Sequence, residues 1–304
     1  MRIVLLSGGV GGARFACGLQ DVLAPGELTV VGNVGDDVEV LGLHVSPDLD
    51  SVLYTLSGLA DEERGWGRAG ETWATLASAA AWGGEDWFRL GDLDLGLHLV
   101  RTRALRRGAT LSSVTAALAE RVGLATTILP ATDDRLRTHV VTPAGEFAFQ
   151  EWFVARGHRD EVDAVRFQGA EGAEPAAGVL EALDGADAII VAPSNPYVSI
   201  APILAVSAIR ASMEARRVRS VAVSPLIGGK AVRGPADRML QRMAGGTTPA
   251  HLARGYEGLV DALVIDTADS PAEAPVELVA TDTLMRDREA ARGLASVVLE
   301  IACA

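Results

Sequence analysis

The chain has 304 residues, of which 49% are hydrophobic and 22% are charged, and its formal net charge is −13. This length is enough for a full hydrophobic core, and the composition is ordinary for a soluble globular protein. The acidic balance, without a basic stripe, argues against a nucleic-acid partner. No apolar run approaches the ~20 residues that span a bilayer, so we expect no membrane partner either.

The two cysteines, Cys17 and Cys303, have no metal-like spacing and predict no disulfide framework. This usage suits a reducing compartment. The apolar run Ile3–Leu6 before the first glycines is too short for a signal peptide. We therefore expect a cytoplasmic protein.

Apolar runs bounded by glycine or proline alternate with helix-length segments, which is typical of βαβ units. Strands are predicted at Arg2–Leu6, Leu28–Val31, Ile128–Leu129, Ala188–Val191, Ser220–Val223 and Ala262–Ile265. Helices are predicted at Gly12–Leu23, Leu49–Leu56, Ala69–Ala81, Asp94–Arg107, Leu111–Val122, Ile200–Ala215, Gly234–Met243 and Asp287–Ile301. The expected fold class is α/β, a Rossmann-like and mostly parallel sheet with helices on both faces.

One section interrupts this alternation. The segments Thr138–Thr142 and Glu146–Gln150 flank Pro143-Ala144-Gly145 and have the period-2 pattern of a β-hairpin. The following residues, up to about 178, are rich in charge and glycine. We therefore predict a small α+β insertion, a second subdomain over 131–178, between the two parts of a nucleotide-binding core at 1–130 and 179–304.

Four glycines, Gly8, Gly9, Gly11 and Gly12, lie between the first predicted strand and the first predicted helix. Glycines at a helix N-terminus allow backbone N–H groups to approach a phosphate, although a tight strand-to-helix turn would also need them. The loop lacks the lysine of a Walker loop, because Ala13-Arg14 follows Gly12. Arg14 also stands where a dinucleotide fingerprint has its third glycine, so the loop favours a phosphate other than NAD or a P-loop triphosphate.

Polar residues follow several of the predicted strands, at the edge where ligands bind in parallel sheets. These clusters are Asn33–Asp37, Ser194-Asn195 and Ser224–Lys230. Asp36 and Asp37 form an acidic pair that could hold Mg²⁺ beside a phosphate. A helix N-cap with a solvated neighbour explains the same pair equally well.

Other polar residues allow two interpretations each. Asp50 follows a predicted helix start, so it could sit in the first turn or act as a hydrogen-bond acceptor or base. Arg89 could lie over a planar ring or bind phosphate. Asp94, His98 and Arg101 share one face of their predicted helix, which by default indicates a surface ion-pair network.

Seven segments occur together in the order in which a known family carries them: Gly8–Phe15, Asn33–Asp37, Pro47–Asp50, Leu90–Asp94, Phe149–Trp152, Pro193–Pro196 and Ser224–Ile227. On these motifs the chain resembles the 2-phospho-L-lactate transferase family of coenzyme F-420 biosynthesis, including its actinobacterial phosphoenolpyruvate-using members. The resemblance extends from Met1 to about Ile301.

The resemblance implies a transferase that moves a phospholactyl or phosphoenolpyruvyl group from a guanosine diphosphate-linked donor to the deazaflavin Fo. The ribityl hydroxyl of Fo would attack and GMP would leave, with Mg²⁺ as cofactor and a homodimer as the expected assembly. By position, Asp50 and Arg89 match the residues of the family that contact Fo, and Asp50 is the candidate catalytic residue. Gly8, Gly9, Gly11, Gly12, Ser194 and Asn195 match the nucleotide side, and Asp36 and Asp37 are the candidate metal ligands.

Two other classes of protein were weighed against this one. A nucleotide-sugar-binding regulatory protein of a related branch would share the glycine and asparagine loops but lack the pair Asp50 and Arg89. An NAD-dependent oxidoreductase is disfavoured by Arg14 and by Asn33, because the latter stands where an acid should bind the ribose. The sequence does not indicate which three-carbon acid the donor carries.

Overall fold

The computed structural model describes all residues, 1–304. Its centre is a parallel sheet of seven strands in the order β14-β13-β10-β9-β1-β2-β5. The strand bounds are β1 Ile3–Ser7, β2 Leu28–Gly32, β5 Thr127–Pro130, β9 Ala188–Val191, β10 Ser220–Val223, β13 Ala262–Asp266 and β14 Glu277–Thr281. Every residue of β1, β9, β10 and β13 is buried, as expected for central strands covered on both faces.

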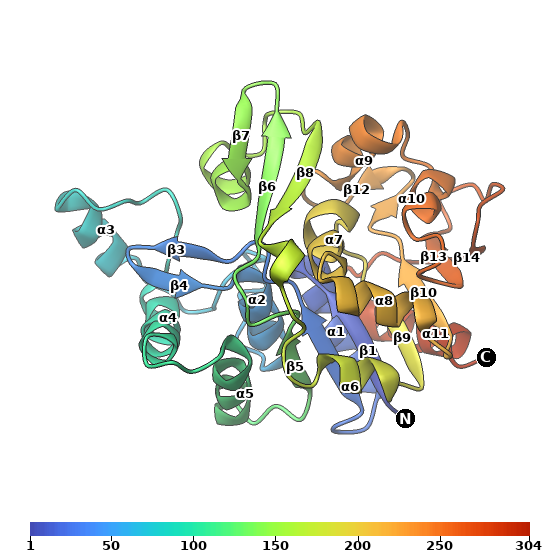
Figure 1. The fold of residues 1–304 in the computed structure, drawn as a ribbon, viewed down its shortest axis with the longest axis horizontal. Coiled ribbons are helices and arrows are strands. Elements are labelled where there is room, and N and C mark those ends of the chain that lie inside the picture. The colour runs from blue at the N-terminus through green and yellow to red at the C-terminus, as the bar shows by residue number, and fades with distance from the viewer.

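Helices cover both faces of this sheet, with α6 and α8 on the near side in Figure 1 and α1 and α11 on the far side. The helix bounds are α1 Gly9–Val22, α2 Pro47–Leu56, α3 Ala74–Ala81, α4 Asp92–Leu105, α5 Leu111–Arg121, α6 Val179–Asp184, α7 Ala201–Leu204, α8 Ser207–Ala215, α9 Ala236–Ala244, α10 Pro249–Gly255 and α11 Arg288–Ala302. Three short turns complete the set at Glu151–Ala155, Ala170–Gly172 and Pro196–Ile200. The Rossmann-like α/β class expected from the sequence is confirmed.

Two small antiparallel units project from the core, one to the left and one to the top of the view in Figure 1. The first is the hairpin of β3 (Val38–Val40) and β4 (Leu43–Val45), and the second is a sheet in the order β7-β6-β8. This sheet comprises β6 Arg137–Thr142, β7 Gly145–Ala148 and β8 Ala164–Gln168, so the hairpin expected around Pro143–Gly145 is present. A further two-stranded ribbon pairs β11 Leu226–Ile227 with β12 Lys230–Ala231.

The three-stranded sheet is attached to the core by its own apolar cluster. Trp152 is fully buried there with Val140 and Val162, and it packs against Val198 and Met239 from the core. The sheet therefore has a definite position relative to the carboxyl ends of the core strands. The division of the chain at 131–178 into an inserted subdomain stays a prediction.

One predicted helix was wrong. The segment 200–215 is not a single helix, because the Pro196–Leu204 and Ser207–Ala215 portions meet at an angle of 89°. Pro202 lies in the first turn of α7, where its missing N–H is tolerated, and the chain turns again before α8. No single helix is long and apolar enough to cross a membrane, and only this bent pair has the combined length and composition.

Candidate functional site

Three buried carboxylates gather beside the end of β2. Asp36 and Asp37 lie in the loop after this strand, and Asp48 lies in the first turn of α2. Asn33 connects them, because its Nδ2 donates to Oδ2 of Asp48 at 2.9 Å and to Oδ1 of Asp36 at 3.4 Å. The Oδ1 of Asn33 accepts from the backbone N–H of Gly35 at 2.7 Å, which orients the amide. The neutral amide of Asn33 therefore donates to two carboxylates. Neither Asp36 nor Asp48 forms an ion pair with a cationic side chain.

Burial and mutual repulsion act on the pKa values of this cluster. Burial, followed by the charges of Asp48 and Asp37, raises the pKa of Asp36 well above its usual range. Burial also raises the pKa of Asp48 to about 6, although hydrogen bonds from Asn33 and the backbone N–H of Gly9 oppose this shift. Burial and mutual repulsion therefore oppose the charged forms of Asp36 and Asp48, and a bound cation would favour those charged forms.

Asp37 has a carboxylate oxygen that is available to such a cation. Its Oδ2 lies 2.9 Å from Nε2 of His44 and accepts from Oγ of Ser46 at 3.1 Å, whereas its buried Oδ1 has no partner. No three His, Cys, Asp or Glu side chains form a ready-made metal site. Mg²⁺, however, binds through one or two carboxylates and completes its shell with water and phosphate oxygens. The donor set of Asp36 and Asp37 fits an ion that is shared with a phosphorylated substrate.

The glycine loop begins α1 directly beside these carboxylates. Gly8 precedes the helix, and a Cβ atom at this position would lie 2.6 Å from Oδ2 of Asp48. A Cβ atom at Gly11 would lie 2.9 Å from the carbonyl oxygen of Pro193, and Gly9 has a φ of +69°. Gly8 has no side chain to cap this helix N-terminus, and the carboxylate of Asp48 accepts the N–H of Gly9 instead. The glycines are thus needed for close packing inside the protein, and the N–H groups of Val10 and Gly11 in the first turn have no side-chain partner.

Ser194 holds the glycine loop against the end of β9. Its Oγ donates to the carbonyl oxygen of Gly8 at 2.6 Å, and a Cβ atom at Gly12 would lie 2.7 Å from this Oγ. The neighbouring Asn195 uses its Oδ1 to accept the backbone N–H of Tyr197 at 3.0 Å. The structure therefore brings Ser194 to the glycine loop, whereas Asn195 caps the short turn Pro196–Ile200.

Asp50 belongs to a different buried cluster, on the other side of α2. It is 5% exposed, and both of its carboxylate oxygens accept from the guanidinium of Arg101, which is 1% exposed. His98 continues the network, with its Nδ1 3.3 Å from Nη1 of Arg101 and its Nε2 3.2 Å from Oδ1 of Asp94. The interpretation of Asp94, His98 and Arg101 as a surface network was wrong. The reason is that α4 packs this face against α2 and buries it, a contact that helical spacing alone does not reveal.

Tyr54 closes this buried network at its far end. Its hydroxyl donates to Oδ1 of Asp94 at 2.5 Å. Burial, with the charges of Asp50 and Asp94, raises the pKa of Tyr54 above its ordinary value, so the phenol remains a donor. Burial alone would raise the pKa of Asp94, but hydrogen bonds from His98 and Tyr54 hold it below the usual value. Asp50 is therefore held by a chain of hydrogen-bonded side chains that extends from α2 to α4.

Arg89 lies apart from Asp50, in the loop before α4. Its guanidinium lies over the ring of Trp73, 4.6 Å from the centroid, and Arg64 lies 5.1 Å from the same ring. No hydrogen bond or ion pair joins Arg89 to Asp50. The structure therefore does not bring the two residues matched to the Fo contacts together directly.

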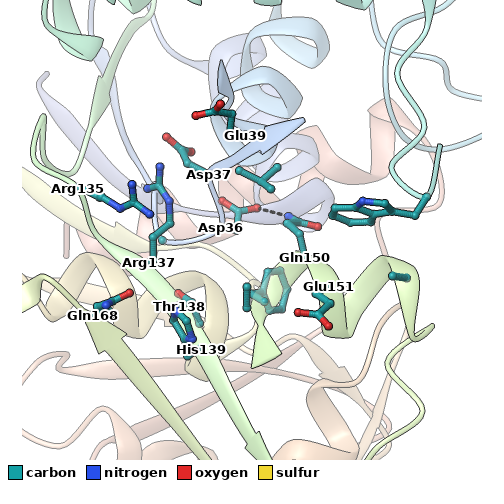
Figure 2. Close-up of a pocket in the computed structure, with 16 residues that line it drawn as sticks. Asp36, Asp37, Glu39, Arg135, Arg137, Thr138, His139, Gln150, Glu151 and Gln168 are labelled. Atoms are coloured by element: carbon teal, nitrogen blue, oxygen red, sulfur yellow. Dashed lines mark hydrogen bonds between the residues drawn. The ribbon is translucent and has the colours of Figure 1, made fainter. Parts of the chain in front are cut away.

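The main cavity, with a volume of about 700 Å³, opens between the carboxylate cluster and the three-stranded sheet. Figure 2 shows Asp36 and Asp37 on one wall and Arg135, Arg137 and Gln150 pointing toward them from the other parts of the lining. Gln150 spans the two walls, because its Nε2 donates to Oδ2 of Asp36 at 3.1 Å. Neither Asp50 nor Arg89 lines this cavity.

Sequence reasoning missed several of these residues. Asp48 was not among the candidate metal ligands, and no role was given to Gln150, Arg135 or Arg137. The segment Phe149–Trp152 was one of the recognised motifs, which was the available signal for Gln150. Nothing in the pattern of residues 131–137 indicated that their arginines would face Asp36, because that relation depends on how the small sheet packs on the core.

The chain was compared with known proteins. The model of the family described as "2-phospho-L-lactate transferase CofD" matches residues 3–297. The chain belongs to this family. Curated relatives include the phosphoenolpyruvate transferases of Streptomyces griseus (45% identical, 99% of this chain and 98% of the relative) and Kitasatospora aureofaciens (46% identical, with the same coverage). That of Nocardia farcinica is 42% identical over 99% of this chain and 95% of its own length.

Solved structures show the same fold at much lower identity. A crystal structure of a UPF0052-family protein from Bacillus halodurans has a TM-score of 0.67 at 16% identity and covers 98% of both chains. A second structure from this organism has a TM-score of 0.66 at 17% identity. Membership of the 2-phospho-L-lactate transferase family makes the chain an enzyme, a transferase of phospholactate or phosphoenolpyruvate in coenzyme F-420 biosynthesis.

Proposed function

We propose that the chain transfers a phospholactyl or phosphoenolpyruvyl group from a guanosine diphosphate-linked three-carbon acid to the ribityl hydroxyl of Fo and releases GMP. The observation that carries this proposal is the buried cluster of Asp36, Asp37 and Asp48, which has no ion pair with a lysine or arginine and lies beside the glycine loop and the cavity. Phosphoryl transfer depends mainly on positioning and charge neutralisation, so a site of this kind suits it.

The diphosphate of the donor would lie at the N-terminus of α1. The N–H groups of Val10 and Gly11 and the positive end of the helix dipole would serve the phosphates, and the lack of a side chain at Gly11 lets the backbone approach them closely. Ser194 fixes this loop through its hydrogen bond to Gly8, and Asn195 shapes the turn beside it. These residues form the nucleotide side of the proposed site.

Asp36 and Asp37 would hold Mg²⁺, with Oδ1 of Asp37 as an oxygen that has no partner in the protein. When bound, Mg²⁺ would neutralise charge on the phosphate oxygens. The two carboxylates are oriented by hydrogen bonds within the protein: Asn33 contacts Asp36, and His44 and Ser46 contact Asp37. An acidic protein that binds an acidic donor needs such a cation, since repulsion between the two would otherwise oppose binding.

In the transfer step, the ribityl oxygen of Fo forms a bond to the phosphorus that carries the three-carbon acid. The bond from this phosphorus to the bridging oxygen breaks, and GMP leaves with the electron pair. We assign Asp50 to orient the hydroxyl and accept its proton. Each carboxylate oxygen of Asp50 accepts one hydrogen bond from Arg101 and keeps a second lone pair for another donor.

Arg89 is proposed to contact the deazaflavin. Its guanidinium already lies over the ring of Trp73, which shows that this position can pack a cation against an aromatic ring. A homodimer and a cytoplasmic location complete the proposal. Size-exclusion chromatography with light scattering would test the dimer, and a mass of one chain, 31.7 kDa, would contradict it.

The test is a fluorescence titration of Fo with purified protein, with and without GDP and Mg²⁺. We expect saturable binding by the wild type and weaker binding by Asp50→Asn, which keeps the volume of the side chain. Asp237→Asn, in the first turn of α9, is the matched control and should bind normally. Circular dichroism would show that each variant is folded, because Asp50 is buried against Arg101.

Turnover is measured by the release of GMP from the donor in the presence of Fo, followed by chromatography. GMP release that requires both Fo and Mg²⁺ would support the proposal. Binding of a nucleotide with no Fo binding under any condition would instead favour the regulatory protein of the related branch. The identity of the product, determined by mass spectrometry, would show which three-carbon acid is transferred.

A further inference from the structure

Arg135 and Arg137 enter the main cavity without a carboxylate partner. Arg137 is the first residue of β6, and Arg135 precedes it by two residues in the connecting segment. Both line the cavity, and Figure 2 shows their guanidiniums directed toward the wall that carries Asp36 and Asp37. None of the ion pairs of the chain includes either arginine.

Their hydrogen bonds leave most donors free. The guanidinium of Arg137 donates once to the protein, from Nη1 to the carbonyl oxygen of Leu136 at 2.7 Å, and that of Arg135 makes no such bond. Both arginines thus keep donors free in a chain with 40 acidic and 27 basic residues. Arg166, on β8 of the same small sheet, does find a partner in Glu146 at 2.8 Å. Two neighbouring guanidiniums with free donors form a site for an oxyanion.

We propose that Arg135 and Arg137 bind the carboxylate of the three-carbon acid carried by the donor. This inference rests on the proposed function. The donor has two kinds of anionic group, and the phosphates would be served by the N–H groups of the glycine loop and by a cation held by Asp36 and Asp37. The carboxylate is attached to the carbon whose oxygen is bonded to phosphorus, so it would lie close to Asp36 and Asp37, on the side away from the nucleotide. The arginines are the cationic side chains on that side of Asp36.

The position of Gln150 supports this arrangement. Its amide bridges the two walls through Asp36, so the segment 135–150, which contains both arginines, is linked to the loop of Asp36 and Asp37. A donor bound between these walls would contact the core through its phosphates and the small sheet through its acid. The three-stranded sheet thereby becomes the part of the enzyme that recognises the transferred group.

The experiment compares two ligands that differ only in the carboxylate. One is the guanosine diphosphate ester of lactate, and the other is the isopropyl ester, in which a methyl group replaces the carboxylate. Binding is measured by calorimetry with Mg²⁺ and without Fo, so that no transfer occurs. We expect the wild type to prefer the lactyl ester by roughly 10- to 100-fold, the range for charge-assisted hydrogen bonds.

The variants are Arg137→Met and Arg135→Met, with Arg166→Met as the control on the same sheet. Arg137→Met should lose most of the preference for the lactyl ester and keep the affinity for the isopropyl ester and for GDP. Arg137→Lys should restore part of the preference, since it restores the charge without the planar fork. The control should retain the whole preference.

Two results would overturn this inference. If the arginine variants lose affinity for GDP and for both esters equally, the guanidiniums bind the diphosphate and not the acid. If they keep the full preference for the lactyl ester, the carboxylate is bound elsewhere. Failure of the wild type to bind any of the three ligands would instead contradict the proposed donor itself, so the two failures are distinguishable.

Discussion

Arg101 on α4 binds both carboxylate oxygens of Asp50 on α2, and the exposed fractions of the two residues are only 1% and 5%. The pair fixes the position of Asp50 relative to the rest of the protein before any ligand arrives. It also commits the charge of Asp50 to an internal partner. Its removal should therefore affect both stability and the geometry of the proposed acceptor site.

We expect Arg101→Met to lower the free energy of unfolding by about 3–5 kcal/mol, because it leaves the carboxylate of Asp50 buried without a counter-ion. The measurement is urea denaturation followed by circular dichroism. Arg286→Met is the control, since its pair with Asp282 is exposed and should contribute no more than about 1 kcal/mol. The double variant Asp50→Asn with Arg101→Met should be more stable than Arg101→Met alone. An equal loss in both would show that the pair is not coupled.

Two of the helix-interior glycines, Gly18 and Gly96, should respond to alanine in opposite ways. A Cβ atom at Gly18 on α1 would collide with the backbone of Ala291 on α11, whereas nothing lies within 4 Å of one at Gly96 on α4. We expect Gly18→Ala to destabilise the protein by roughly 1–3 kcal/mol through overpacking. Gly96→Ala should stabilise it by about 0.5–1 kcal/mol through helix propensity. Thermal and urea unfolding would check both, and a stable Gly18→Ala variant would contradict the close crossing of α1 and α11.

The raised pKa of Asp48, about 6, has a definite consequence for stability in the absence of metal. A carboxyl with a folded pKa above its unfolded value binds its proton more tightly in the folded state. Its favourable contribution is therefore complete below about pH 4 and is lost as the pH rises through 6. The free energy of unfolding of Asp48→Asn, taken relative to that of the wild type, should therefore rise by about 2 kcal/mol between pH 4 and pH 7.5. Urea denaturation of both proteins in EDTA at pH 4 and at pH 7.5 would measure this change. If the stability difference between the variant and the wild type is the same at both pH values, the shifted pKa is contradicted.

Mg²⁺ should stabilise the wild type in the presence of GDP, by about 1.4 kcal/mol for each tenfold excess over its dissociation constant. Asp37→Asn should remove most of this gain, because it replaces a carboxylate oxygen that has no protein partner with a neutral one. Differential scanning fluorimetry with increasing Mg²⁺ would follow the midpoint. Asp237→Asn serves as the control outside the cluster. A full Mg²⁺ response in Asp37→Asn would place the ion elsewhere.

Much of the architecture could be predicted because it depends on local patterns. The strands Ala188–Val191 and Ser220–Val223 occur at their predicted residues, since continuous apolar runs between turn residues have few other structures. The strand Glu277–Thr281 was missed, because it lies at the edge of the sheet and is only partly buried. The hairpin of Val38–Val40 and Leu43–Val45 was missed as well, since its strands are too short to show a period.

The candidate site divides in the same way. By itself, the sequence determined the family, the Rossmann-like class and the glycine loop, because these are carried by motifs of contiguous residues. Only the tertiary structure decided that Asp48 joins Asp36, that Arg101 neutralises Asp50, and that Arg135 and Arg137 face the carboxylates. Each of these relations joins residues on different elements. Burial and pairing of charges depend on how those elements pack, and no local pattern records that packing.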